Sequence, residues 1–273
     1  MPPAYDRVWM TPLDNGHLMA TGYDARARKQ YRYHPDWSAA KAAEKFAALP
    51  AFGETLPRIR GRISRDLNNR EAGDERFALA AALLLIDETA MRVGNDVYAA
   101  ENGTYGATTL QRRHLRLRDA GLDLSWTAKG GQKVRRRIRS KRLMRALQAA
   151  RDLPGAELFT WIGPEGDLRR VTSTSLNAYL AEIGGQEGFT AKTFRTWAGS
   201  LAAYDCHRRE GEGATIRSMT EAAAAALANT PASARTSYGR PAVIGLAGQE
   251  AALLPEARRG LSKAETGLLE LLS

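Results

Sequence analysis

The sequence has a single cysteine and only four histidines among its 273 residues. One thiol, Cys206, cannot form a disulfide within the chain, which is typical of proteins of the reducing cytosol. The histidines show none of the spacings at which zinc ligands recur, so we expect no metal site. The most apolar run, residues 77–86, is too short to span a bilayer and predicts a buried helix. Since the N-terminus carries no apolar signal segment, we expect a soluble cytoplasmic protein without a membrane span.

Acidic residues are also fewer than basic ones. The chain has 40 Lys and Arg against 30 Asp and Glu, a formal net charge of +10, which is typical of proteins that bind a polyanion. No glycine is followed directly by a lysine, and this excludes the phosphate-binding loop of ATP-dependent enzymes. We therefore expect a nucleic-acid partner and no nucleotide cofactor. Because only eight of the 40 basic residues are lysines, a lysine at a distinctive position is informative.

Local patterns divide the chain near residue 38. The first 38 residues are rich in aromatic side chains, alternate in the manner of strands and contain an Asn15-Gly16 hairpin signal. Helical periodicity dominates after that, and residues 261–273 predict an amphipathic helix that packs on the rest. We predict an α+β protein with a small β-rich domain at 1–38 and a mainly helical domain at 39–273.

One β-hairpin interrupts the helical part. Apolar and polar residues alternate from 121 to 128, and Gly130 and Gly131 can supply the positive φ angles of a two-residue turn. This pattern puts Lys129 at the tip of the hairpin, on its polar face.

An alanine-rich helix ends at Asn229, and a second helix follows it. Thr230 can cap this second helix and Pro231 fits its first turn. Tyr238 then lies roughly two turns further along, directly before a glycine. Two interpretations remain open from these residues alone. The asparagine and tyrosine are either a cap and a packed core residue, or a pair placed for chemistry.

Cationic side chains recur at two further places. Lys192 and Arg195 are three residues apart on a predicted helix, where a shared anion would relieve their mutual repulsion. A solvated basic face explains the same spacing equally well. Arg92 follows the predicted buried helix and precedes Gly94, so it can either meet such an anion or cap the carbonyl groups of its own helix.

Together these side chains provide what cleavage of a DNA phosphodiester requires. Arginines can bind the nonbridging oxygens and stabilise the charge of a pentacoordinate transition state. A tyrosine oxygen can attack the phosphorus and hold it as an ester, and a lysine can protonate the leaving 5′-hydroxyl. This chemistry does not require a metal.

In the order and spacing of these residues, the chain resembles the poxvirus-like type IB DNA topoisomerases found in bacteria. The resemblance is carried by five segments: QYRYH (30–34), RVGNDVYAAENGTYGATTL (92–110), AKGGQK (128–133), KTFRTWAGS (192–200) and NTPASARTSY (229–238). It implies a helical catalytic domain of the kind that type IB topoisomerases share with tyrosine recombinases. The catalytic residues that it implies are Arg92, Lys129, Arg195, Asn229 and the nucleophile Tyr238. The DNA-binding residues that it implies are Gln30, Tyr31, Tyr33, Asn95, Tyr98, Thr109 and Lys192.

The resemblance also implies an activity. Such an enzyme relaxes supercoiled double-stranded DNA through a 3′-phosphotyrosyl intermediate, strand rotation and religation, as a monomer at the nucleoid and without ATP or metal. Viral members have a histidine at the position of Asn229, whereas bacterial members commonly have asparagine. Bacterial relatives usually carry several dozen residues before the segment that resembles PPAYDRVW (2–9), so we expect a shortened N-terminal clamp domain here.

Two other functions remain open. A tyrosine recombinase shares much of the catalytic set, but such enzymes typically have a histidine where Lys192 stands, lack the QYRYH segment and act as tetramers. A DNA-binding protein without catalysis is the second alternative, although all five implied catalytic positions are filled in this chain.

Overall fold

The computed structural model describes residues 2–25, 27–118, 121–185, 188–238 and 241–273, without the side chains of 235–238 and 241. The chain divides into two compact units, Met1–Ala47 and Ala48–Ser273. The predicted boundary between residues 38 and 39 lies nine residues before this division and falls inside the helix Pro35–Ala47. The helix goes with the preceding strands, since its Trp37 lies against His17 with ring centroids 5.0 Å apart.

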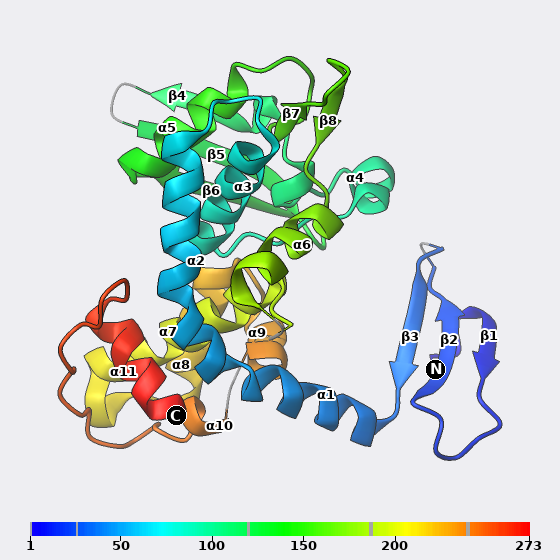
Figure 1. Ribbon diagram of the computed structural model, residues 1–273. Helices are drawn as coiled ribbons and strands as arrows, with labels where there is room; N and C mark the ends of the chain where they lie inside the picture. The colour runs from blue at the N-terminus through cyan, green and yellow to red at the C-terminus, as the bar shows by residue number, and fades with distance from the viewer. Residues whose placement is uncertain (1, 26, 119–120, 186–187, 239–240) are drawn as a thin grey trace. The chain divides into compact units, whose positions relative to one another are not determined.

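The first unit is a three-stranded antiparallel sheet followed by this helix. Strands β1 (Asp6–Met10), β2 (Leu18–Tyr23) and β3 (Lys29–Tyr33) lie side by side in chain order, and α1 (Pro35–Ala47) follows them (Figure 1). The predicted Asn15-Gly16 turn lies in the connection between β1 and β2. The buried strand residues of this unit belong to β2, because β2 is the central strand.

The second unit is mainly helical and contains two small antiparallel sheets, β4-β5-β6 and β7-β8. Its helices are α2 (Leu49–Asn69), α3 (Glu75–Thr89), α4 (Asp96–Asn102), α5 (Lys141–Arg151), α6 (Ser173–Gly184), α7 (Ala191–Glu210), α8 (Ile216–Leu227), α9 (Pro231–Tyr238), α10 (Pro241–Ile244) and α11 (Lys263–Leu272). Its strands are β4 (Leu115–Arg118), β5 (Gly121–Ala128), β6 (Gln132–Ile138), β7 (Thr160–Ile162) and β8 (Leu168–Arg170). Within the described ranges, no helix is both long and apolar enough to cross a membrane.

Helix α3 is the centre of the hydrophobic core. Residues 77–86 are all buried in it, which confirms the buried helix predicted for this run. The helix packs against α2, α5, α6 and α7. Between α2 and α7, the Phe52 ring lies 4.9 Å from Phe194 and 6.0 Å from Trp197, measured between centroids. Burial of these large rings fixes α7 relative to the helices around α3.

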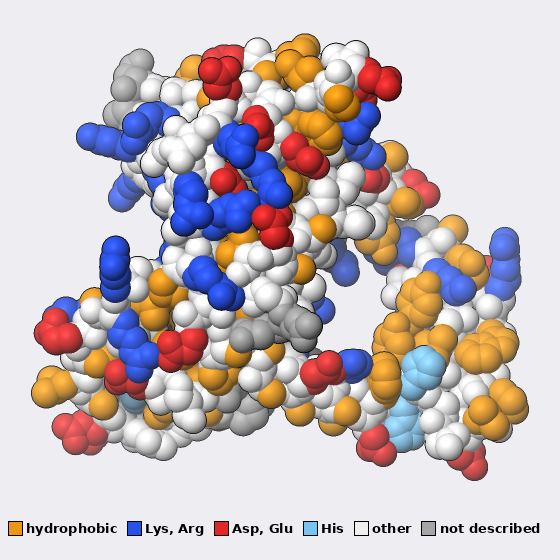
Figure 2. All heavy atoms as spheres, in the orientation of Figure 1, with side chains coloured by type: hydrophobic (Ala, Val, Ile, Leu, Met, Phe, Trp, Pro, Cys, Tyr) orange, Lys and Arg blue, Asp and Glu red, His pale blue; other side chains and the backbone are white. Residues whose placement is uncertain are grey.

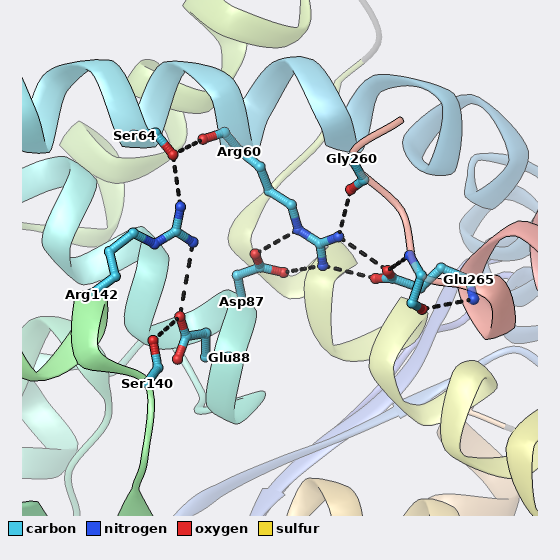
Figure 3. A network of polar contacts seen from close by, with 9 residues as sticks. Arg60, Ser64, Asp87, Glu88, Ser140, Arg142, Gly260 and Glu265 are labelled. Atoms are coloured by element: carbon cyan, nitrogen blue, oxygen red, sulfur yellow. Dashed lines mark hydrogen bonds and ion pairs between the residues drawn. The ribbon is translucent and has the colours of Figure 1, made fainter. Parts of the chain in front are cut away.

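A buried polar network ties the C-terminal helix to the same core (Figure 3). The guanidinium of Arg60 on α2 donates to Asp87 on α3 at 2.9 and 3.0 Å, and to Glu265 on α11 at 3.1 and 2.8 Å. Burial raises the pKa of Glu265, but hydrogen bonds from Arg60 and from the backbone and side chain of Ser262 outweigh this effect and lower it below 4.5. The predicted C-terminal helix is therefore confirmed, and it is held by charge as well as by packing.

Charged side chains of both signs are mixed on one face of the second unit. Figure 2 shows Lys and Arg side chains interspersed with Asp and Glu over α2 and its neighbours. Arg62, for example, lies 2.8 Å from Asp66 and 3.0 Å from Glu182. Paired charges of this kind offset each other.

The substitution Glu265→Gln tests the network. It removes the charge that Arg60 meets on α11, and we expect the free energy of unfolding to fall by about 2 kcal/mol, since a hydrogen bond to a charged group contributes on that order. The measurement is urea denaturation followed by circular dichroism. Glu256→Gln serves as the control, because Glu256 pairs with Lys263 at the surface with 93% of its side chain exposed. An equal loss in both variants would contradict a special role for Glu265.

Candidate active site

The end of α3 leads directly to Arg92. Ala90 caps the helix in the left-handed region at φ 52°, and its N–H donates to the Ile86 carbonyl. Residues 90–95 then run without regular structure to Asn95, whose side chain accepts from the Tyr98 N–H and caps α4. Arg92 is therefore carried on a short connection between two capped helices.

Close backbone contact fixes this connection. The carbonyl of Arg92 accepts from the Ala107 N–H at 2.8 Å, and the neighbouring carbonyl of residue 93 accepts from the Thr108 N–H at 2.6 Å. A Cβ atom on Gly106 would lie only 2.4 Å from the backbone nitrogen of Gly94 and 2.5 Å from the Arg92 oxygen. Only glycine at position 106 allows this approach, so the backbone of Arg92 is held against the 106–108 turn.

Arg195 lies on α7 and is 3% exposed. Its guanidinium donates to the carbonyl of Ala90 at the end of α3 and, at 3.1 Å, to the carbonyl of Leu227 at the end of α8. One side chain thus connects the ends of two helices whose last residues have no intrahelical partners for their carbonyl groups. A solvated basic face does not explain Arg195, although its neighbour Lys192 is exposed.

Asn229 completes this arrangement. Its side-chain oxygen accepts from the guanidinium groups of both Arg92 and Arg195, the latter at 3.4 Å. Because guanidinium groups only donate, the oxygen of the amide has to face them, and its NH₂ group remains a donor. Two cations that converge on one neutral amide create a site where an anion such as a phosphate is stabilised.

Lys129 lies at the tip of the β5–β6 hairpin, as predicted. Gly130 and Gly131 have φ angles of 82° and 77°, which confirms the predicted positive φ at both. The predicted two-residue turn is wrong, however, because Ala128 pairs with Gln132 and leaves residues 129–131 as a three-residue loop. Lys129 therefore belongs to the loop itself and is exposed.

A pocket of about 280 Å³ brings six of the twelve predicted site residues together. Four cationic side chains line it, from the connection after α3, the hairpin tip and α7: Arg92, Lys129, Lys192 and Arg195. Asn95 and Tyr98 also line it, and none of its described lining residues is acidic. The pocket therefore concentrates positive charge.

The element that carries Tyr238 agrees with its sequence signals. Helix α9 begins at Pro231, and the Thr230 hydroxyl accepts from the Ser233 N–H at 3.3 Å, so the predicted cap and first turn are confirmed. Tyr238 is the last residue of α9, and its side chain lies outside the described part of the chain. The interpretation of Tyr238 as a reactive residue stays a prediction.

The other predicted DNA-binding residues lie elsewhere. Thr109 is buried, and its hydroxyl accepts from the Gly106 N–H at 3.0 Å, so it stabilises the turn beside Arg92 and does not line this pocket. In the first unit, the rings of Tyr31 and Tyr33 are exposed and stacked with centroids 6.3 Å apart. Gln30 on the same strand donates to Asp24 at 3.0 Å.

Tyr105 is a pocket residue that the sequence reasoning missed. Its hydroxyl accepts from Arg113 at 2.7 Å, and its ring lies 4.5 Å from the His114 ring. Burial and the nearby Arg113 lower the pKa of His114 to about 4, so this imidazole is neutral near pH 7. The position of Tyr105 between two glycines was a signal that the backbone approaches closely there, but it did not indicate a pocket.

Comparison with known proteins gives matches over most of the chain. The family model for the catalytic core of eukaryotic DNA topoisomerase I matches residues 34–236, and that for the N-terminal domain of bacterial DNA topoisomerase IB matches residues 1–24. DNA topoisomerase 1B of Acanthamoeba polyphaga mimivirus is 32% identical over 205 residues, which cover 74% of this chain and 60% of the viral protein. Mitochondrial DNA topoisomerase I of Rattus norvegicus is 25% identical over 177 residues, which cover 61% of this chain and 26% of the rat protein. The chain thus spans less than two thirds of the length of either relative.

The backbone contact beside Arg92 can be tested with Gly106→Ala. The added Cβ would overlap two backbone atoms, and we expect the free energy of unfolding to fall by about 2 kcal/mol, a typical cost of overpacking. Urea denaturation measures the change. Gly61→Ala is the matched control, because a Cβ at that position in α2 meets nothing within 4 Å and alanine favours a helix. A Gly106→Ala variant as stable as the wild type would show that the two segments are not held together.

Proposed function

Because the chain belongs to the type IB family of DNA topoisomerase I, we propose that it relaxes supercoiled DNA by cutting and rejoining one strand. Tyr238 is the proposed nucleophile. The pocket lined by Arg92, Lys129, Lys192 and Arg195 is the proposed site of the scissile phosphate.

The contact of Arg92, Arg195 and Asn229 is the observation that carries this proposal. It supports a phosphate-binding role because contacts with the Asn229 amide oxygen hold two guanidinium groups within reach of one another. The nonbridging oxygens would lie against both arginines and the amide NH₂ of Asn229. These groups would stabilise the additional negative charge of the pentacoordinate transition state.

In the cleavage step, the phenolic oxygen of Tyr238 attacks the phosphorus and loses its proton to solvent. A bond forms between this oxygen and phosphorus, while the bond from phosphorus to the 5′-oxygen breaks. Lys129 donates a proton to the leaving 5′-oxygen, since an alkoxide is a poor leaving group. The products are a 3′-phosphotyrosyl ester and a free 5′-hydroxyl.

The free strand then rotates about the intact one, and the 5′-hydroxyl attacks the phosphotyrosyl ester to restore the phosphodiester. Each step exchanges one phosphodiester for another, so the energy of the cleaved bond is kept and ATP is not required. The cationic side chains stabilise charge directly, and the scheme proposed here uses no metal.

Duplex DNA would be gripped by side chains from both units. Gln30, Tyr31 and Tyr33 of the β-rich unit are proposed contacts, together with Asn95 and Tyr98 of the pocket. Phosphate contacts from lysine and arginine set affinity without selecting a sequence. We further propose that the enzyme acts as a monomer on nucleoid DNA in the cytoplasm.

The proposal predicts relaxation of a supercoiled plasmid in EDTA without ATP, and none by the Tyr238→Phe variant. Loss of the phenolic oxygen removes the nucleophile but leaves the cationic pocket, so DNA binding measured by fluorescence anisotropy should persist. Detergent quenching should also trap a covalent adduct on the 5′-labelled strand with wild-type protein only.

Tyr204→Phe is the matched control, since Tyr204 lies on α7 with its hydroxyl directed toward Gly267 of α11, and it should retain relaxation activity. DNA binding by the wild type without relaxation would contradict the proposal and favour a non-catalytic DNA-binding protein. Exchange limited to specific sites would indicate a recombinase.

The role of Lys129 predicts a dependence on the leaving group. Lys129→Ala should reduce the cleavage rate constant by about 10²- to 10⁴-fold, the typical contribution of general acid catalysis. The same variant should cleave a substrate with sulfur in place of the bridging 5′-oxygen at nearly the wild-type rate, because a thiolate leaves without protonation. Lys133→Ala, which removes an exposed lysine of the same hairpin, is the control for charge. A Lys129→Ala defect that persists with the sulfur substrate would exclude the general-acid role.

A further inference from the structure

One arginine extends from the apolar side of the β-hairpin. Val134, Arg136 and Ile138 alternate along β6, and cross-strand pairing sets them opposite Trp126, Leu124 and Leu122 of β5. All of these residues are buried except Arg136, which is half-buried. An arginine among core residues carries a cost unless its donors find partners.

The partners of Arg136 are the last carbonyl groups of α8. Its Nη2 atom donates to the Ala225 oxygen at 3.0 Å and to the Ala226 oxygen at 2.7 Å. Backbone N–H groups of residues 228 and 229 occupy the Ala224 oxygen, and Arg195 donates to that of Leu227. Each of the last four carbonyl groups of α8 therefore accepts a hydrogen bond, and Arg136 is a donor to two of these groups.

This helix end determines where Asn229 lies. The intervening residue, Ala228, adopts the left-handed conformation at φ 48° and ψ 54°, which is unfavourable for any residue with a Cβ. Surrounding contacts have to hold such a conformation in place. Arg136 supplies two of them, and it also lines a cavity of about 10 Å³ together with Arg92 and Arg195.

We propose that Arg136 is a positioning residue for strand cleavage, an inference that rests on the proposed function. Its guanidinium connects the hairpin that carries Lys129 to the end of α8 that carries Asn229. Through the α8 carbonyls it keeps the Asn229 amide oxygen against Arg92 and Arg195. In both of these hydrogen bonds the partner of Arg136 is a backbone carbonyl, so Arg136 acts on the phosphate through Asn229.

The first test compares Arg136→Gln with Arg135→Gln. Arg135 is the adjacent residue on the opposite face of β6, where it pairs with Asp123 at 2.7 Å, so both variants lose one positive charge on the same strand. Arg136→Gln should lower the single-turnover cleavage rate constant by about 10- to 100-fold, the effect of one or two charge-assisted hydrogen bonds. Arg135→Gln should leave it within about threefold of the wild type. Binding affinity for the same duplex should decrease equally in the two variants.

A double-mutant cycle with Asn229→Ala separates positioning from general destabilisation. If Arg136 acts through Asn229, Arg136→Gln should cost less than about threefold in cleavage rate when Asn229 is already alanine. If the two losses multiply, the proposal is wrong. Arg136→Lys, which keeps the charge but has one nitrogen in place of the planar fork, should give an intermediate rate and confirm that the fold is retained.

The outcomes distinguish the two proposals. If the wild-type protein does not cleave DNA, the proposed function fails. If the wild type cleaves and Arg136→Gln cleaves as fast, only the role of Arg136 fails. Equal rate losses in the Arg135 and Arg136 variants would likewise overturn it, because they would reflect charge and not position.

Discussion

The shared contact of two guanidinium groups with one amide oxygen is the interaction on which the pocket depends. Arg92 follows the end of α3, Arg195 lies near the start of α7, and Asn229 follows the end of α8. Two positive charges at such close range repel each other, and because Arg195 is buried and Arg92 half-buried, the repulsion is only partly screened. The oxygen of Asn229 and the carbonyls of Ala90 and Leu227 offset it. The three elements meet here because the guanidinium donors of Arg92 and Arg195 are complementary to these carbonyl and amide oxygens.

The donors of this arrangement are held by contacts within the protein itself. Arg195 is buried and held by two backbone carbonyls, and the backbone of Arg92 is held by the turn at Gly106. Side chains fixed in this way do not have to reorganise when negative charge develops between them. The exposed Lys129 and Lys192 differ, since each is free to adjust to a bound duplex. The pocket therefore combines arginines held by the protein with exposed lysines that can adjust their position.

Local signals were sufficient to predict the elements that carry the site. The apolar run of α3, the positive φ angles of Gly130 and Gly131 and the Thr230-Pro231 helix start each depend on neighbours in sequence, and each is confirmed. The contact between Arg92 and Asn229 was not predictable from local signals, because these residues are 137 positions apart in the chain. The turn at Lys129 was predicted one residue too short, since its length depends on strand register. Arg136 was concealed in a run of arginines, where only the pairing with β5 distinguishes its face.

The dependence of the core on α11 has a consequence for the order in which the chain is made. Arg60 and Asp87 are synthesised well before Glu265, the other carboxylate that binds Arg60. Until α11 has left the ribosome, the helix that leads to Arg92 lacks one of its charged supports. The pocket therefore becomes fully stable only after α11 has been made. A chain in which α11 has not yet formed would therefore hold Arg92 less firmly than the folded protein does.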